Sequence, residues 1–151
     1  MSNIINHIGG GGTSRDEVVL FDIGEGIDIT GGWTAVSSGG GSTMTKNANG
    51  WIFSHPSRTS ITYDTFRPTN ISQEALAWAN PIIVFEFYLA SGNAFNVITR
   101  DYGQSLYSLG TNNAKTSQSI RYTSGSCFGA SPPANNTCSL CITKVYIYNA
   151  N

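Results

Sequence analysis

The chain has 151 residues, with eight basic and nine acidic side chains, a net charge of −1 and a charged fraction of only 11%. This length fits one domain with a single core, and the scattered cations do not form the cluster that binding to nucleic acid requires. No apolar run approaches the roughly 20 residues of a membrane span, so no membrane partner is expected. The first residues lack the basic and apolar segments of a secretory signal, so synthesis in the cytoplasm is expected.

Neutral polar residues take the place of charges in this sequence. Glycine, serine, threonine and asparagine make up 64 of the 151 residues. Threonine fits the pleated surface of a sheet, glycine, asparagine and serine fit turns, and strong helix formers are scarce. Seven phenylalanines, seven tyrosines and three tryptophans supply a large core. The composition therefore predicts an all-β domain.

Residues 1–16 are expected to form an arm that precedes the domain. Four consecutive glycines at residues 9–12 predict a flexible linker, and the segment before them carries the apolar residues Ile4, Ile5 and Ile8. A short apolar segment on such a tether is suited to anchoring on a partner protein or on a sister subunit. The alternative is a disordered terminus with no binding role.

From residue 17 onward, short apolar segments alternate with turns rich in glycine, asparagine and proline, which is typical of antiparallel strands. The expected strands cover residues 17–22, 27–30, 33–36, 42–45, 51–54, 60–66, 82–89, 95–100, 105–109, 116–123 and 141–148. Their number and spacing predict a two-sheet antiparallel β-sandwich of the jelly-roll type over residues 17–151.

Four segments of this domain carry more specific expectations. Residues 82–89 are the most apolar and are expected to form a central strand, paired as a hairpin with residues 95–100. In residues 60–66, Ile61 and Tyr63 alternate with Thr62 and Asp64, which predicts a strand whose apolar face is buried. A helical turn begins near Ser72, and residues 124–137 are expected to form a loop.

The sequence contains no motif that is typical of catalysis. His7 and His55 are not near a nucleophile motif such as Gly-x-Ser-x-Gly, and the nine carboxylates are dispersed. Cys138 and Cys141 form a CxxC with Cys127 eleven residues earlier, but a fourth zinc ligand is missing nearby. Synthesis in the cytoplasm favours free buried thiols, with one disulfide as the alternative. We therefore do not expect an enzyme, and we expect no cofactor.

Two groups of residues are candidates for binding. Asp22, Glu25 and Asp28 crowd one glycine-rich turn, where carboxylate and carbonyl oxygens could hold a structural calcium ion; the alternative is a solvated acidic turn. Trp33 and Trp51 each follow a glycine, which favours surface positions from which they could stack on sugar rings. The alternative is that both tryptophans belong to the core.

Three segments carry a resemblance to a known group of domains. They are VLFDIGEGIDITGGW at residues 19–33, the apolar strand of residues 82–89 with its hairpin, and ITKVYIY at residues 142–148. Together they resemble small jelly-roll domains, similar to galactose-binding-like domains and carbohydrate-binding modules, that occur in bacteriophage virion proteins. The resemblance implies a fold and a location on the virion, and it supplies no catalytic residues.

The sequence therefore predicts a non-enzymatic virion structural protein, a decoration or fibre-type subunit with the head favoured over the tail. Its expected partners are other virion proteins of the capsid or tail, together with further copies of the chain in a homo-oligomer. The alternative is a carbohydrate-binding or host-adhesion module that recognises a cell-surface glycan.

Overall fold

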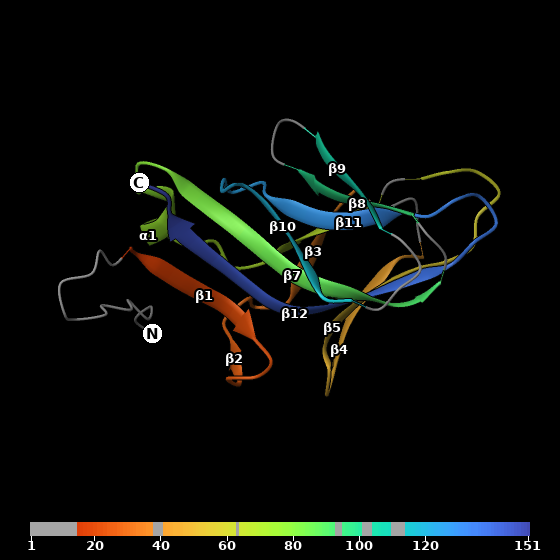
Figure 1. Ribbon diagram of the computed structural model, residues 1–151, viewed down its shortest axis with the longest axis horizontal. Helices are drawn as coiled ribbons and strands as arrows, with labels where there is room; N and C mark the ends of the chain where they lie inside the picture. Colours follow the sequence, from red (N-terminus) through yellow and green to blue (C-terminus); the bar gives the residue numbers. More distant parts are fainter. Residues whose placement is uncertain (1–14, 38–40, 63, 93–94, 101–103, 110–113) are drawn as a thin grey trace.

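The computed structural model describes residues 15–37, 41–62, 64–92, 95–100, 104–109 and 114–151, and it shows two antiparallel sheets packed face to face (Figure 1). The predicted all-β sandwich is thus confirmed. The elements in chain order are β1 (Glu17–Asp22), β2 (Ile27–Asp28), β3 (Trp33–Ser37), β4 (Thr43–Asn47), β5 (Gly50–His55), β6 (Asp64–Pro68), α1 (Gln73–Leu76), β7 (Pro81–Gly92), β8 (Phe95–Arg100), β9 (Gln104–Leu109), β10 (Thr116–Arg121), β11 (Cys127–Ser131) and β12 (Cys138–Asn149).

The last strand, β12, is the centre of the first sheet. The strand order is β10-β7-β12-β1-β2, and β5 with its partner β4 joins the edge of β12 that β1 leaves free. β7 follows the whole length of β12, β1 pairs with its second half, and β5 pairs with its first half. The long apolar segments of the sequence lie in β7 and β12, which both have neighbours on both edges.

The second sheet has the order β3-β6-β11-β8-β9. The predicted hairpin between the strand of residues 82–89 and that of residues 95–100 is wrong. β7 pairs with β12 and β10, whereas β8 pairs with β11 and β9 in the other sheet. Both edges of β7 are occupied by partners of its own sheet, so the next strand is added to the opposite one.

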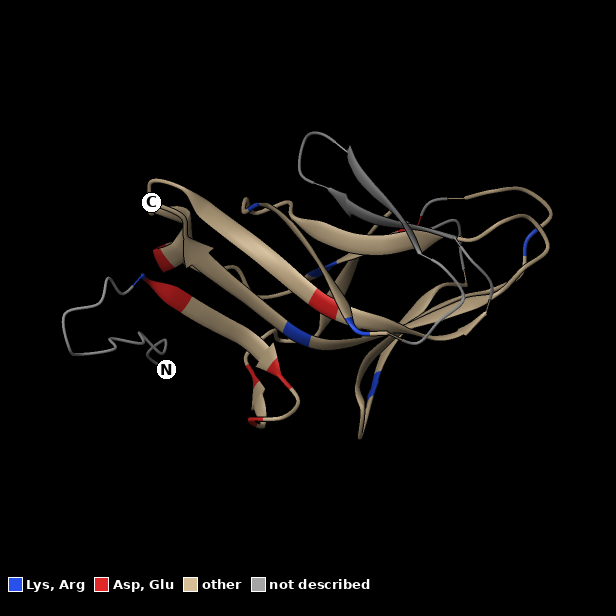
Figure 2. Ribbon diagram, viewed as in Figure 1, with Lys and Arg blue, Asp and Glu red and all other residues tan. Residues whose placement is uncertain are grey.

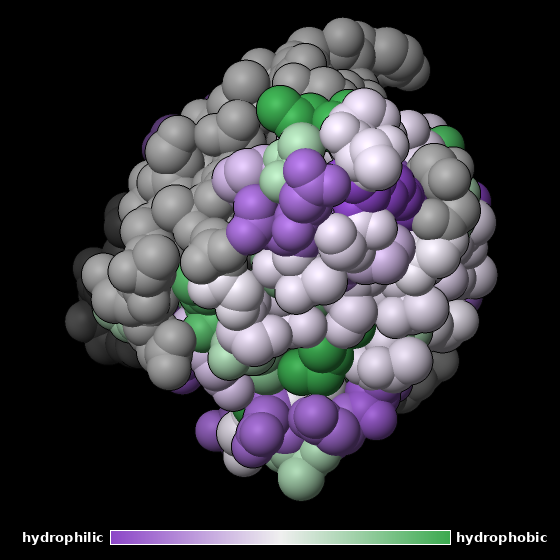
Figure 3. Space-filling view, turned by 90° about the vertical axis from the view of Figure 1, so that its right-hand side faces the viewer, coloured by the Kyte–Doolittle hydropathy of each residue, from purple (hydrophilic) through white to green (hydrophobic). Residues whose placement is uncertain are grey.

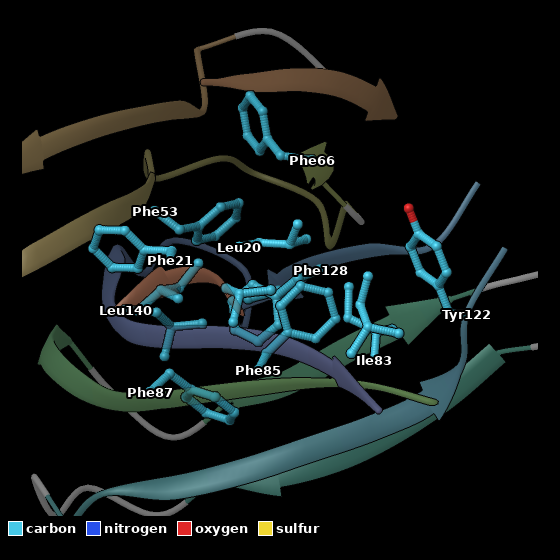
Figure 4. Close-up of a cluster of buried hydrophobic side chains, with 14 of the residues drawn as sticks. Leu20, Phe21, Phe53, Phe66, Ile83, Phe85, Phe87, Tyr122, Phe128 and Leu140 are labelled. Carbon is cyan, nitrogen blue, oxygen red and sulfur yellow. The ribbon is translucent and has the colours of Figure 1, made fainter. Parts of the chain in front are cut away.

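The core fills the space between the two sheets with aromatic side chains. Figure 4 shows that these side chains point toward one another from both sheets. The ring of Phe128, from β11, lies 5.2 Å from Phe85 and 5.0 Å from Phe87, which both come from β7. Phe53 and Phe66 form a second contact between the sheets, with ring centroids 5.9 Å apart. Rings at such distances add specific aromatic contacts to the large apolar area that they bury.

Two sequence predictions are wrong around β6. The strand begins at Asp64 rather than at residue 60, and Ile61 is 58% exposed instead of buried. Asp64 is fully buried because it binds charged and polar side chains inside the sandwich. The segment of residues 124–137, expected to be a loop, contains β11, and every residue of β11 is buried.

The segment Ile-Thr-Gly-Gly-Trp makes a tight turn between the sheets. The side-chain hydroxyl of Thr30 donates to Asp28 Oδ1 at 2.6 Å and accepts from the backbone N–H of Gly32 at 3.1 Å. Gly31 and Gly32 have φ of 69° and 83°, a region that side chains rarely adopt. This turn brings Trp33 from the edge of the first sheet to the first strand of the second.

The helical turn that the sequence predicts is confirmed as α1. Ser72 is its N-cap, and its hydroxyl accepts from the backbone N–H of Ala75 at 3.1 Å. Leu76 and Trp78 pack against the core, as expected for residues that close one end of the sandwich. The C-terminus lies at the same end (Figure 1), where Ala150 N donates to Asn80 O at 2.8 Å.

The predicted arm, residues 1–16, is described only at its last two residues. Asp16 accepts a hydrogen bond from Asn149 N at 3.0 Å, and Arg15 lies over the ring of Tyr148, so both contact the sheet. The anchor residues Ile4, Ile5 and Ile8 lie outside the described residues. In the part of the chain that the structure describes, no helix has the length and apolar character needed to cross a membrane.

Candidate functional site

The outer surface of the first sheet carries three parallel rows of side chains across β1, β12 and β7. The rows follow from strand geometry: the core side chains of these strands point inward, so their neighbours point outward. The first row is Asp22, Lys144 and Glu86, the second is Val19, Tyr146 and Val84, and the third is Glu17, Tyr148 and Ile82. We call these nine residues the tyrosine face.

Two tyrosines of the tyrosine face lie next to each other in space, and each of them contacts a cation. The ammonium of Lys144 is 4.9 Å from the ring centroid of Tyr146, whose centroid is 6.3 Å from that of Tyr148 at an interplanar angle of 32°. The guanidinium of Arg15 is 3.9 Å from the Tyr148 centroid. Contacts between cations and rings at these distances are attractive and hold the side chains in place.

Apolar residues of the same face lie beneath the tyrosines. Val19 and Val84 stand on either side of Tyr146 in the register, and they are only 9% and 6% exposed although they point outward. Side chains on a solvated sheet face are usually polar. The tyrosine face is therefore an apolar and aromatic surface with charged ends, unlike an ordinary solvated face.

Several of the charged residues that the structure describes lie on this surface of the first sheet. They are Arg15, Glu17, Asp22, Glu86, Arg121 and Lys144. Figure 2 shows several of them on β1, β7 and β12, whereas most of the ribbon is uncharged. Lys144 lies 3.8 Å from Asp22, a distance that leaves it able to donate to a ligand. Burial raises the pKa of Tyr146, and Glu86 raises it further, so its hydroxyl is a hydrogen-bond donor at neutral pH.

A fourth tyrosine contact lies next to these rows. Tyr88 of β7 is opposite Cys141 of β12, and their hydrogen bond raises the pKa of Tyr88. The Cys141 thiol donates to Asn49 O at 3.3 Å. All three cysteines are free and buried, and burial raises the pKa of Cys138 to about 12. Burial also raises the pKa of Cys141, so the thiols of Cys138 and Cys141 are protonated and unreactive, which agrees with the structural role expected for them.

Trp33 and Trp51, the residues predicted to stack on sugars, do not lie in open loops. Both are in strands, half-buried, and packed against the core. Their rings contact each other edge to face with centroids 6.4 Å apart, and Trp51 Nε1 donates to Asp28 Oδ2 at 3.1 Å. Their aromatic surface is largely used inside the protein, and sugar binding by them stays a prediction.

Two of the three carboxylates predicted to hold calcium, those of Asp22 and Asp28, are directed to different donors. Asp22 accepts from the backbone N–H groups of Gly24 and Glu25 at 3.0 and 3.2 Å. Asp28 points toward Lys46, whose ammonium is 2.7 Å away. Within the described ranges, no group of three or more His, Cys, Asp or Glu side chains has an arrangement that could hold a metal ion. A calcium ion here stays a prediction from the sequence.

The surroundings of Asp28 predict a dependence of stability on pH. Burial acts to raise its pKa, but hydrogen bonds from Lys46 and Thr30 together bring the pKa below its ordinary value of 3.8. Because the pKa of Asp28 is lower in the folded state, its charged form stabilises the fold at pH values above the ordinary pKa of 3.8. This stabilisation is lost as the pH falls through the folded-state pKa. We expect Asp28→Asn to lower the melting temperature at neutral pH and to reduce its decline in acid. Melting curves between about pH 7 and pH 2 test this, and parallel curves for both proteins would contradict it.

Two other features of the described residues are weaker candidates for a site. A cleft of about 540 Å³ lies beside α1, but its Ser72 caps the helix and its Asn70 donates to Ile29 O at 3.0 Å. The end of the sandwich seen in Figure 3 is mainly hydrophilic or neutral, with apolar residues in small separate patches. The tyrosine face is therefore the strongest candidate site among the described residues.

Comparison with known proteins finds similarity in structure alone. No family model matches the chain, and no curated protein sequence matches it. A tyrosine-to-alanine variant of a family 29 carbohydrate-binding module is similar, with 8% identity, a TM-score of 0.56, and coverage of 90% of this chain and 94% of that one. A family 29 module from Piromyces equi is 11% identical, with a TM-score of 0.53 and coverage of 91% and 93%. These similarities show a shared β-sandwich fold.

Proposed function

We propose that the protein is a carbohydrate-binding module without catalytic activity and that it binds glycans on the tyrosine face. One observation carries this proposal. Aromatic rings and fixed hydrogen-bond donors lie next to one another on an apolar surface, and they belong to Lys144, Tyr146, Tyr148 and Arg15. This reading corresponds to the alternative drawn from the sequence, while the site is a different one.

The chemistry of a sugar matches this surface. A sugar ring has apolar C–H faces that pack on aromatic side chains, and hydroxyls at its edge that need donors and acceptors. Carboxylates and cations form stronger hydrogen bonds to such groups than neutral side chains do. Glu86 and Lys144 are paired across β7 and β12, so a carboxylate and an ammonium are presented side by side.

The structural neighbours support this combination of residues. Family 29 modules have been studied as complexes with cellulohexaose and mannohexaose. Tyrosine, aspartate and lysine variants were used there to probe ligand recognition. The same three kinds of side chain meet on the tyrosine face, which favours a related use in this chain.

Loss of both tyrosine rings tests the proposal. We expect Tyr146→Ala combined with Tyr148→Ala to weaken glycan binding by at least about tenfold, since central aromatic contacts dominate binding free energy. The measurement is a glycan array with purified protein, followed by calorimetry on the strongest glycan. Tyr146→Phe with Tyr148→Phe keeps the rings and should lose less.

The control is Ile61→Ala, because Ile61 is 58% exposed and precedes β6 of the second sheet, whereas the tyrosine face belongs to the first. It should bind as the unaltered protein does. Melting curves establish that each variant is folded, since the tyrosines also cover Val19 and Val84. The proposal is contradicted if the unaltered protein binds no glycan on the array, or if the double alanine variant binds as strongly as the unaltered protein.

A second candidate function is assembly with other proteins. Tyrosine and arginine are enriched in protein interfaces, and Ile82 and Val84 extend the apolar part of the same face. The virion setting, the homo-oligomer and the anchoring role of residues 1–16 stay predictions from the sequence. Light scattering at several concentrations tests self-association: a mass that stays monomeric excludes a homo-oligomer built through this face.

A further inference from the structure

The charges of the tyrosine face are distributed unequally between its two ends. In the first row, one ammonium, from Lys144, stands between the carboxylates of Asp22 and Glu86. At the third row the balance is reversed. Arg15 lies over Tyr148, and Arg121 of β10 extends this row beyond Ile82, so two guanidiniums accompany the carboxylate of Glu17. On the outer surface of the sheet, the third row therefore carries two cations and one anion, and we call this part the positive end.

Both arginines of this end are accessible. The Arg15 side chain is 52% exposed, and its distance of 3.8 Å to Glu17 is long for an ion pair. Arg121 is exposed, and no ion pair to it is found within the described residues. Neighbouring strands lie about 4.8 Å apart, so Arg121 is two strand spacings from Tyr148, within reach of a long side chain and a ligand group together.

We propose that this positive end binds the anionic group of an acidic sugar, a carboxylate or a sulfate ester, while neutral sugars of the same glycan lie over Tyr146 and Tyr148. A guanidinium presents a planar set of donors that matches two oxygens of an anion. Two such groups beside an aromatic ring form a site for an acidic sugar unit. The inference rests on the proposed function and adds the class of glycan.

The test compares lactose, 3′-sialyllactose and 3′-sulfolactose by calorimetry at low salt. The two anionic sugars should bind about tenfold or more tightly than lactose, since hydrogen bonds between charged groups are the stronger ones. The preference should shrink as salt is raised. A preference for 3′-sialyllactose identifies a carboxylate site, and a preference for 3′-sulfolactose identifies a sulfate site.

Arginine variants assign the preference to this end of the face. Arg15→Gln combined with Arg121→Gln should remove the preference for the anionic sugars. Arg121→Gln alone should reduce this preference and leave the affinity for lactose unchanged. Arg67→Gln changes the charge equally on the second sheet, where Arg67 donates to the backbone carbonyl of Pro68, and should keep the preference. Equal binding of the three sugars, or a preference that survives in the double variant, overturns this inference. The proposed function has its separate test in the array with the tyrosine variants.

Discussion

Asp64→Ala is expected to lower the free energy of unfolding by about 3–5 kcal/mol, because removal of one partner leaves a buried charge uncompensated. Asp64 is fully buried, and Arg58 donates to both of its carboxylate oxygens, at 3.2 and 2.8 Å. Ser42 donates to the same carboxylate, and His55 Nε2 is 3.5 Å away. His55 Nδ1 lies 2.7 Å from Pro56 O, a carbonyl that can only accept, so this nitrogen carries a proton.

Urea unfolding measures the effect, and a second variant separates charge from shape. Asp64→Asn keeps an acceptor for Arg58 and should lose less stability than the alanine variant. The control is Arg15→Ala, which removes an exposed ion pair to Glu17 and should cost no more than about 1 kcal/mol. If Asp64→Ala costs as little as this control, the buried ion pairs do not stabilise the sandwich.

Asp64 also marks a limit of prediction from sequence. The alternation of Ile61 and Tyr63 with Thr62 and Asp64 predicted that the apolar pair is buried, and an isolated charge is rarely buried. Its partners come from separate segments: Arg58 is six residues away in the chain, but Ser42 is 22 away. A pattern within one strand cannot show that such donors converge, so the burial of this side chain was not predictable from it.

The long interior strands were predictable for the opposite reason. β7 and the second half of β12 are apolar enough to identify from local sequence, since their burial comes from neighbours on both edges. The cap of α1 was equally local, because Ser72 binds a group three residues away. Strand pairing was not local, and the hairpin assigned to β7 and β8 failed on that account.

The tyrosine face could have been anticipated in part. In β12, Lys144, Tyr146 and Tyr148 alternate with Val145 and Ile147, so the first three must share a face. The apolar pair identifies the inner face and leaves the tyrosines outside. Trp33 and Trp51 were instead predicted to bind sugars because each follows a glycine, although aromatic residues next to turns often belong to the core.

β11 was missed because its sequence resembles a turn. Its five residues include Gly129 and Ser131, and Pro132 and Pro133 follow directly. A Cβ on Gly129 would lie 1.8 Å from Asp64 O of β6, so glycine is required by the close approach of these two strands. The residue that made the segment look like a loop is therefore the one that allows it to pair as a strand.

Phe128→Ala tests whether this strand joins the two sheets. Phe128 is fully buried, and its ring contacts Phe85 and Phe87 of the opposite sheet at 5.2 and 5.0 Å. We expect a loss of about 3–5 kcal/mol in the free energy of unfolding, from lost burial and the cavity that remains. Phe128→Leu fills part of that space and should lose less than half as much.

Urea unfolding with unchanged m values makes the comparison valid, because it shows that the same surface is exposed in each variant. Val36→Ala is the control, since Val36 is 49% exposed on β3 of the same sheet and its loss should stay within about 0.5 kcal/mol. A Phe128→Ala protein as stable as this control would mean that β11 is not packed on β7. The aromatic contacts between the sheets would then be those of Phe53 with Phe66 and of Trp33 with Trp51 and Phe85, and Phe66→Ala would become the more damaging change.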